Sequence, residues 1–173
     1  MHRAGALLLA CLLVPAAAAQ NCDRGADTAG LNQFSAADAG TVTDGRSRLT
    51  WMRCAVGQVW AQGACLREPT RHSWEEARQV AAAVNATGEF FYDDWRLPTV
   101  RELATITKLH CRDPRADLAE FPGTRPDFYW TASTKLIDGP ELVAFALSFG
   151  PQGVQQKHLE EACYVRLVRT AAN

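Results

Sequence analysis

The stretch YDDWRLPTVRELATITKLHC, residues 92–111, determines where one helix of this chain begins. Pro98 keeps the residue before it extended, because the proline ring clashes with a helical neighbour on its N-terminal side. Thr99 and Glu102 have the spacing of a capping box, in which each side chain caps a backbone N–H of the other residue. We therefore interpret the stretch as a folding device and not a catalytic loop, and predict a helix that begins at Thr99 and has Cys111 at its far end. Its core face is predicted to contain Val100, Leu103 and Ile106, with His110 as a further candidate.

A second capping box, formed by Ser73 and Glu76, begins the other segment with helical periodicity. Apolar residues recur there at the spacing of one helix face, and Asn85 and Gly88 are residue types that end helices. The segment SWEEARQVAAAVN is therefore predicted to form a helix that begins at Ser73. Its predicted core face consists of Trp74, Ala77, Ala81 and Val84.

Short extended segments make up most of the remaining chain. Residues 41–53 contain two such pieces around Asp44 and Gly45, a pair that is typical of hairpin turns. The segments FYWTAS and LVAFALSF predict strands, and the second alternates large apolar residues with small ones. Residues 150–153 fit a turn, and CYVRLVR predicts a final strand. Two helices in the first half and antiparallel strands in the second predict an α+β domain.

The first 19 residues have the three parts of a secretory signal: the basic start MHR, the apolar run AGALLLACLLV and the small-residue region PAAAAQ. Ala17 and Ala19 occupy typical cleavage positions, so the mature protein is predicted to start near Gln20. Lipoprotein cleavage at Cys11 is the alternative, but its apolar segment would be unusually short. No later segment approaches the ~20 apolar residues of a transmembrane helix. We therefore expect a periplasmic or extracellular protein with a signal (residues 1–19), an N-terminal arm with little core of its own (20–40) and one domain (41–173).

Cysteines in an exported domain are mostly oxidised. The chain has six, of which Cys11 lies in the signal. An odd number remains in the mature part, so one thiol stays free or pairs with another chain. Cys54 and Cys65 lie within residues 54–71, which have neither helical nor strand periodicity. We predict that these two cysteines form a disulfide that staples a loop, with a stabilisation of ~3 kcal/mol from chain entropy.

Charge and motif content disfavour several classes of function. Once Arg3 is removed with the signal, the remaining lysines and arginines nearly balance the 19 aspartates and glutamates, so no nucleic-acid partner is expected. The histidines, at positions 2, 72, 110 and 158, lack the spacing of zinc ligands. Neither the pair Asp93 and Asp94 nor the pair Asp138 and Glu141 has a calcium-site pattern. No nucleophile elbow, phosphate loop or zinc-protease motif occurs, and we expect no cofactor, metal or catalysis.

Basic residues are the main candidates for ligand contact. Arg101, Lys108 and Arg112 are spaced by seven and four residues on the predicted second helix, so that they would share one stripe. Arg115 follows just past the end of that helix. Such a stripe suits sulfates or other anions; the alternative is a solvated face opposite the core.

Two further residues have distinct expectations. Trp60, in the predicted stapled loop, is the tryptophan expected to be exposed for stacking on a sugar or a partner. Arg96 is expected to brace a buried carboxylate or the backbone instead of contacting a ligand.

Six motifs, in this order, resemble those of the Lcl C-terminal domain family: GTVTDGRSRLTWMRC, SWEEA, DDWRLPTVREL, FPGT, YWTAS and YVRLVR. The family is named for the tail domain of a bacterial collagen-like adhesin, and the resemblance spans residues 40–169. It implies a bacterial envelope or secreted protein whose fold is similar to C-type lectins and formylglycine-generating enzymes. In that fold a small twisted antiparallel sheet is flanked by two helices and the terminal strand pairs with the first. We therefore expect residues 164–169 beside residues 41–53.

The resemblance also bears on the cysteines. It favours a disulfide between Cys22 and Cys111, which would tie the arm to the second helix; Cys111 with Cys163 is the alternative. The formylglycine-generating oxidase holds copper between two cysteines late in its sequence. Here Cys163 alone lies in that region, so a copper site is not expected.

The adhesin is associated with trimer formation and with binding of sulfated polysaccharides, which leaves a homo-oligomer and an anionic ligand open for this chain. The chain has no Gly-x-y stalk, so the multivalent gain of a trimeric stem is missing. We predict an exported, non-catalytic binding module of the bacterial envelope or cell surface, which recognises a polysaccharide, sulfated or otherwise anionic, or an envelope protein. The alternative is a structural or accessory subunit of a pilus or surface assembly, tethered by the arm and the odd cysteine. A small enzyme comes third.

Overall fold

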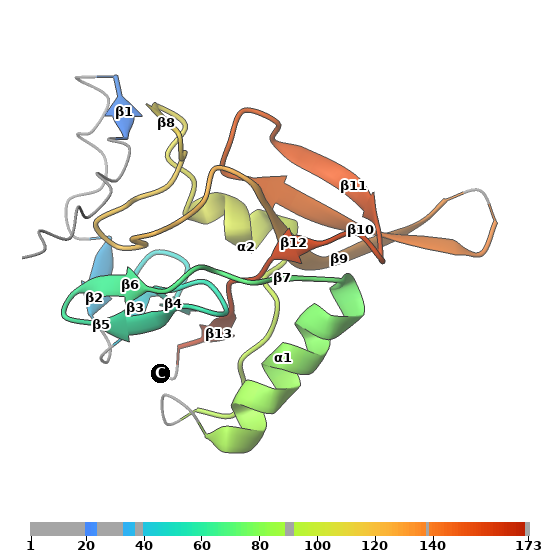
Figure 1. The fold of residues 1–173 in the computed structure, drawn as a ribbon, viewed down its shortest axis with the longest axis horizontal. Coiled ribbons are helices and arrows are strands. Elements are labelled where there is room, and N and C mark those ends of the chain that lie inside the picture. Colours follow the sequence, from blue (N-terminus) through green and yellow to red (C-terminus); the bar gives the residue numbers. More distant parts are fainter. Residues whose placement is uncertain (1–19, 24–32, 37–39, 89–91, 138, 172–173) are drawn as a thin grey trace, which may run out of the picture.

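The computed structural model of the protein describes residues 20–23, 33–36, 40–88, 92–137 and 139–171 (Figure 1). Residues 1–19, predicted to be a secretory signal, lie outside this part. Within the described residues, two larger sheets, two small ladders and two helices make an α+β arrangement that is mostly β-sheet. None of the described helices is long and apolar enough to cross a membrane.

A four-stranded antiparallel sheet joins the two ends of the domain. Its strands, in spatial order, are β13 (Val168–Thr170), β4 (Leu49–Met52), β3 (Thr41–Asp44) and β2 (Phe34–Ala36). β3 and β4 form the predicted hairpin, and the Asp44 carboxylate organises its turn by accepting hydrogen bonds from the Arg46 N–H (2.9 Å) and the Ser47 hydroxyl (2.7 Å). β13 pairs with β4, so the expected position of residues 164–169 beside residues 41–53 is confirmed for residues 168–169, whereas Tyr164 pairs in the other sheet.

The second sheet has five strands. In spatial order they are β11 (Val154–His158), β10 (Glu141–Ser148), β9 (Phe128–Ile137), β12 (Cys163–Tyr164) and β7 (Arg71–His72). The prediction of one final strand, CYVRLVR, is wrong, because the chain leaves β12 and crosses to β13 in the other sheet. At the crossing the Val165 carbonyl accepts a hydrogen bond from the Val56 N–H (2.9 Å), outside either ladder.

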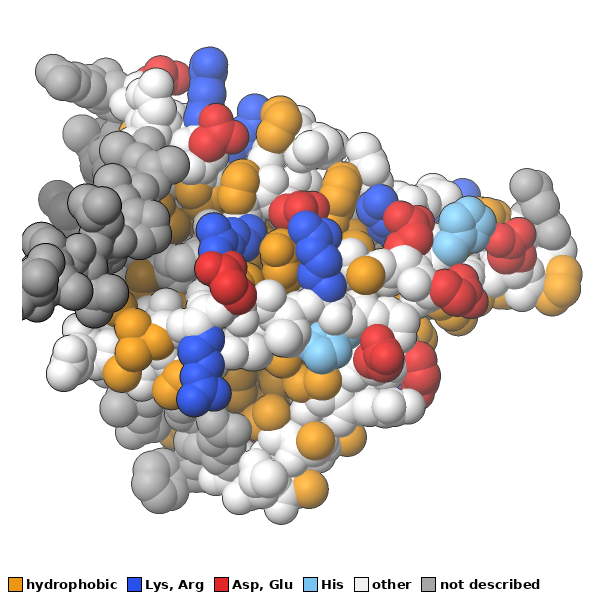
Figure 2. Space-filling view, in the orientation of Figure 1, with side chains coloured by type: hydrophobic (Ala, Val, Ile, Leu, Met, Phe, Trp, Pro, Cys, Tyr) orange, Lys and Arg blue, Asp and Glu red, His pale blue; other side chains and the backbone are white. Residues whose placement is uncertain are grey.

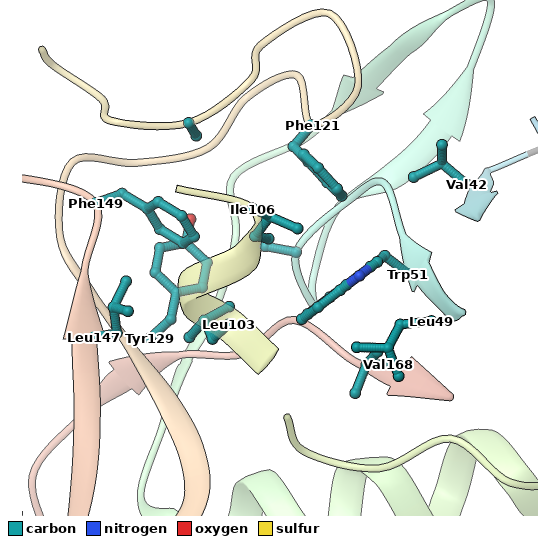
Figure 3. Packing of buried hydrophobic residues seen from close by; sticks show 12 residues of the cluster. Val42, Leu49, Trp51, Leu103, Ile106, Phe121, Tyr129, Leu147, Phe149 and Val168 are labelled. Carbon is teal, nitrogen blue, oxygen red and sulfur yellow. The ribbon is translucent and has the colours of Figure 1, made fainter. Parts of the chain in front are cut away.

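Both faces of β10 are buried, because the strand contributes to two core clusters. Its large residue Leu147 belongs to a cluster with Trp51, Leu103, Phe121, Tyr129 and Phe149. Its small residues Ala144 and Ala146 belong to a second cluster with Trp95, Trp130, Leu97 and Val165. In the first cluster, Leu103 and Ile106 lie between Tyr129 on one side and Trp51 on the other (Figure 3).

Both helices begin where the capping boxes predict. Ser73 is the N-cap of α1 (Trp74–Thr87) and Thr99 is the N-cap of α2 (Val100–Thr105), and both reciprocal hydrogen bonds of each box are formed. Gly88 ends α1 in the left-handed conformation (φ 64°) that favours glycine. Local sequence therefore sets the helix starts.

The predicted core faces are mostly confirmed. Leu103 and Ile106 are buried and Val100 is half-buried, whereas His110 is half-buried outside the helix. The residues predicted for the core face of α1 are either buried or packed against the second cluster: Trp74, Ala77, Ala81 and Val84.

The second helix is much shorter than predicted. α2 ends at Thr105, so Cys111 is not at its far end but in strand β8 (Cys111–Arg112). Residues 105–107 are three consecutive β-branched residues, which lower helix propensity because their χ1 angles are restricted in a helix. Thr107 instead forms an antiparallel bridge with Ala116.

Replacing Thr99 with alanine is expected to lower the free energy of unfolding by about 1 kcal/mol, because the hydroxyl accepts the Glu102 N–H (3.2 Å) that no helical carbonyl can reach. Denaturant titration measures the change. Arg101→Ala, on the exposed face of α2, is the control and should leave the unfolding free energy within about 0.5 kcal/mol. Equal stability of the two variants would contradict the capping role.

Residues 54–71 contain regular structure that their sequence pattern does not predict. β5 (Val59–Ala61) and β6 (Ala64–Leu66) form a hairpin whose turn residues, Gln62 (φ 51°) and Gly63 (φ 80°), both have positive φ. A type I′ turn requires these angles. The register places Trp60 opposite Cys65.

The described parts of the predicted N-terminal arm belong to the folded domain. β2 extends the four-stranded sheet, and the Phe34 ring packs edge-on against Phe121, with 5.5 Å between ring centroids. β1 (Asn21–Cys22) pairs with β8. These described parts of the arm therefore gain their order from the rest of the chain.

Candidate functional site

Three hollows of the described surface are candidate ligand sites. The helix groove lies between α1 and the chain that precedes α2 and has a volume of about 810 Å³. The tryptophan cleft lies between the β5–β6 hairpin and α1, with about 290 Å³. The arginine pocket lies beside β8, with about 100 Å³. The three hollows differ in whether the polar side chains that line them already form hydrogen bonds or ion pairs within the protein.

Polar side chains of the helix groove are engaged within the protein. Arg96 donates two hydrogen bonds to Glu102 (2.8 and 2.7 Å), which lower the pKa of that carboxyl. The Asn85 amide bonds both the N–H and the carbonyl of Trp95 (2.8 and 2.9 Å). Arg96 therefore braces a carboxylate, as expected, although Glu102 is half-buried. The polar side chains of the groove hold its two walls together, which indicates a structural role.

The tryptophan cleft is apolar. Its floor and walls include Met52, Val56, Val80 and Val84, and Figure 2 shows hydrophobic side chains gathered in the hollow beside α1. Trp60 lines it but is half-buried, less exposed than expected. The Arg53 guanidinium lies over its ring, 4.8 Å from the centroid. Part of the stacking surface of Trp60 is therefore covered by the protein itself.

The predicted basic stripe does not exist, because α2 ends before two of its three members. Arg101 is exposed on α2, but Lys108 follows the helix and forms an ion pair with Asp117 (2.8 Å). Arg112 lies in β8. The spacing of seven and four residues therefore does not place these side chains on one helix face.

Two of the four predicted basic residues nevertheless come together. Arg112 and Arg115 line the arginine pocket, together with Asp113, Gly150 and Pro151. Neither arginine forms an ion pair within the part of the chain that the structure describes. The pocket is small, about 100 Å³, which suits one sulfate, phosphate or carboxylate group. Guanidinium groups bind such groups through paired N–H donors.

Backbone contacts fix the segment that carries the two arginines. The Arg115 N–H donates to the Phe149 carbonyl (2.6 Å), and the Arg115 carbonyl accepts from the Lys108 N–H (3.0 Å). These bonds bring residues 112–115 to the turn at residues 150–153. That turn was expected from its residues, but no local signal indicates that it meets the arginines.

The described residues include two disulfides, Cys54–Cys65 and Cys22–Cys111, and Cys163 is a buried free thiol. The first pairing agrees with the local prediction and the second with the pairing that the family resemblance favours; the Cys111–Cys163 alternative is wrong. Burial raises the pKa of the Cys163 thiol to about 11. Within the described residues, no group of three or more His, Cys, Asp and Glu side chains could hold a metal ion.

Comparison with known proteins gives one family. A family model described as the Lcl C-terminal domain matches residues 40–169. No curated protein matches the chain. The matched region contains both helices, the Cys54–Cys65 disulfide and every residue of the arginine pocket.

Proposed function

The chain belongs to the Lcl C-terminal domain family, and from that premise we propose that it is an exported, non-catalytic binding module of a bacterial envelope or cell surface. Its ligand in this proposal is a polysaccharide that carries sulfate or other anionic groups. The observation that carries the proposal is the arginine pocket, where Arg112 and Arg115, neither of which forms an ion pair in the described structure, line one hollow. The two disulfides support export, since such bonds persist in oxidising compartments.

The fold proposal is a C-type-lectin-like domain. It is supported by the pairing of the last strand with an early one and by two helices beside small twisted sheets. In this proposal the sheets and disulfides form a rigid frame, and ligand contacts come from the irregular segments between them. Arg112 is the last residue of β8, and Arg115 lies on the irregular segment that follows it, between β8 and β9.

Charge distribution decides what kind of affinity to expect. The net charge of the chain is −1, so a polyanion is attracted by the local pocket and not by the whole surface. Contacts between exposed charges are screened over ~8 Å at physiological ionic strength. We therefore expect weak binding that falls steeply with salt.

The double substitution Arg112→Ser and Arg115→Ser is expected to abolish retention on a heparin column at low salt, because it removes both donors of the pocket. The logarithmic salt dependence of heparin affinity should lose about one contact per arginine. Arg46→Ser with Arg101→Ser is the matched control, since it removes the same charge from two exposed sites outside the pocket and should keep most of the retention. Thermal unfolding of both variants shows whether the fold is intact.

Four outcomes are informative, three from that experiment and one from a glycan-binding assay. Unchanged retention after the pocket substitutions, or no retention of the unaltered protein, would overturn the polyanion proposal. Equal losses in both double variants would indicate a general charge effect. Binding of neutral glycans that is lost on Trp60→Ala and kept without the pocket arginines would move the site to the tryptophan cleft.

The competing proposal is a structural or accessory subunit of a pilus or surface assembly. A tether through the odd cysteine needs an accessible thiol, whereas Cys163 is 2 % exposed and its raised pKa disfavours the reactive thiolate. Purification as a stable monomer would favour the binding module. A requirement for a partner protein during expression would favour the subunit.

A further inference from the structure

The segment at residues 20–23, which we name the N-terminal clasp, lies along the outside of the chain that forms the arginine pocket. The Gln20 side-chain amide donates hydrogen bonds to the carbonyls of Pro114 and Ala116, both at 2.6 Å. β1 pairs with β8 in a register that places Asn21 opposite Arg112 (Figure 1). The clasp therefore contacts the backbone on both sides of Arg115 and directly opposite Arg112.

A covalent bond and a further hydrogen bond complete the clasp. Cys22 is opposite Cys111 in the ladder and is joined to it by a disulfide. The Asp23 N–H donates to the His110 carbonyl (2.9 Å). Each of the four clasp residues therefore contacts residues 110–116, through its side chain or its backbone.

Residues 110–116, which carry the two pocket arginines, have little other regular structure to define their shape. β8 has two residues and its ladder partner is β1. The other backbone contacts of this segment in the described structure are the Thr107–Ala116 bridge and three hydrogen bonds: Lys108 N–H to the Arg115 carbonyl (3.0 Å), Cys111 N–H to the Lys108 carbonyl (3.1 Å) and Arg115 N–H to the Phe149 carbonyl (2.6 Å). None of them involves Arg112 itself. An isolated pair of two-residue strands is not stable. The β1–β8 ladder therefore depends on the other clasp contacts.

We propose that the N-terminal clasp is the positioning element of the anion site, so that Gln20 and the Cys22–Cys111 disulfide direct Arg112 and Arg115 into one pocket. The inference rests on the proposed function of that pocket. Gln20 acts through the Pro114 and Ala116 carbonyls and does not itself line the pocket. Anion affinity then depends on a segment that lies before the family-matched region, residues 40–169.

Loss of the clasp is expected to affect binding separately from folding. None of the four clasp residues belongs to either core cluster, so the core stays intact without them. The disulfide joins residues 89 positions apart, however, and its removal lowers stability through the unfolded state. Stability alone therefore cannot identify a positioning role, and the salt dependence of binding is the measurement that can.

The test uses the full chain and heparin as the probe. Gln20→Ala removes the two amide hydrogen bonds and leaves both disulfides; Gln79→Ala, an exposed glutamine on α1, is its control. Cys22→Ala with Cys111→Ala removes the clasp disulfide, and Cys54→Ala with Cys65→Ala removes the other one. Both clasp variants should lose about one contact from the salt dependence. The two control variants should keep the slope of the unaltered protein, whatever their melting temperatures.

The outcomes separate the inference from the proposed function. If the unaltered protein binds heparin and both clasp variants keep its slope, the inference is overturned and the anion site stands. If the unaltered protein does not bind, both are overturned. Should the Cys22/Cys111 variant fail to fold, Gln20→Ala decides alone, because it leaves the covalent frame in place.

Discussion

Replacing Arg166 with alanine is expected to lower the free energy of unfolding by at least about 3 kcal/mol, since each buried acceptor left without a donor costs about 1–3 kcal/mol. The Arg166 guanidinium is 0 % exposed and donates to the carbonyls of Met52 (3.0 Å) and Arg53 and to the Thr124 hydroxyl (2.8 Å). All three acceptors lose this donor together.

Arg166 is unusual because its buried charge has no acidic partner within the described residues. Burial lowers the pKa of Arg166, but an arginine remains protonated in proteins. Its charge is stabilised by the two carbonyl dipoles and by aromatic rings, with the guanidinium carbon 5.0 Å from the Phe121 ring centroid. The side chain thereby joins the crossing between β12 and β13 to the end of β4.

A series at this position separates charge, volume and hydrogen bonding. Arg166→Met keeps much of the volume without the donors, so it should be destabilised but less than Arg166→Ala, which also leaves a cavity. Arg166→Lys keeps the charge but cannot reach the three acceptors with one planar group. Denaturant unfolding gives the order of the three variants in free energy of unfolding. An alanine variant within 1 kcal/mol of the unaltered protein would contradict the role assigned to the hydrogen bonds.

Trp130→Ala is the second substitution with a large expected effect, about 3–5 kcal/mol, because it removes a fully buried indole from the core. Trp130 is 0 % exposed and belongs to the cluster that includes Ala77 and Ala81 of α1. Its indole N–H donates to the His72 carbonyl (2.7 Å) in β7. The ring therefore holds α1 and β7 against β9.

Two controls define the measurement for Trp130. Trp130→Phe keeps most of the apolar contact and loses the hydrogen bond, so it should cost clearly less than the alanine variant. Leu136→Ala, on the same strand but 61 % exposed, should change stability by less than about 0.5 kcal/mol. Equal effects of Trp130→Ala and Leu136→Ala in thermal or denaturant unfolding would contradict the packing described for this strand.

The short length of α2 links the fold to the proposed site. Had the helix continued through residue 112, Arg112 and Arg115 would lie on and beyond a helix face, as the sequence analysis predicts. Its end at Thr105 frees residues 107–117 to reach both the N-terminal clasp and the turn at residues 150–153. The candidate anion site is thus a consequence of where that helix stops.

Features that depend on neighbours in the chain were predictable from the sequence. The helix starts at Ser73 and Thr99 follow from side chains three residues away, the β3–β4 hairpin from its Asp-Gly turn, and Cys54–Cys65 from a short separation. The pairing of β13 with β4 and the Cys22–Cys111 disulfide were expected from the family resemblance and not from local pattern.

Features that depend on distant groups were decided by the tertiary structure. Residues 105–112 have apolar spacing compatible with a helix, but the ladder with β1 and the bridge to Ala116 offer their backbone other hydrogen-bond partners. The final strand divides because each half pairs with a different sheet. The arginine pocket combines two residues before β9 with a turn after β10. Hydrogen bonds and burial between segments far apart in sequence outweigh weak local propensities, so only the assembled fold brings these arginines together.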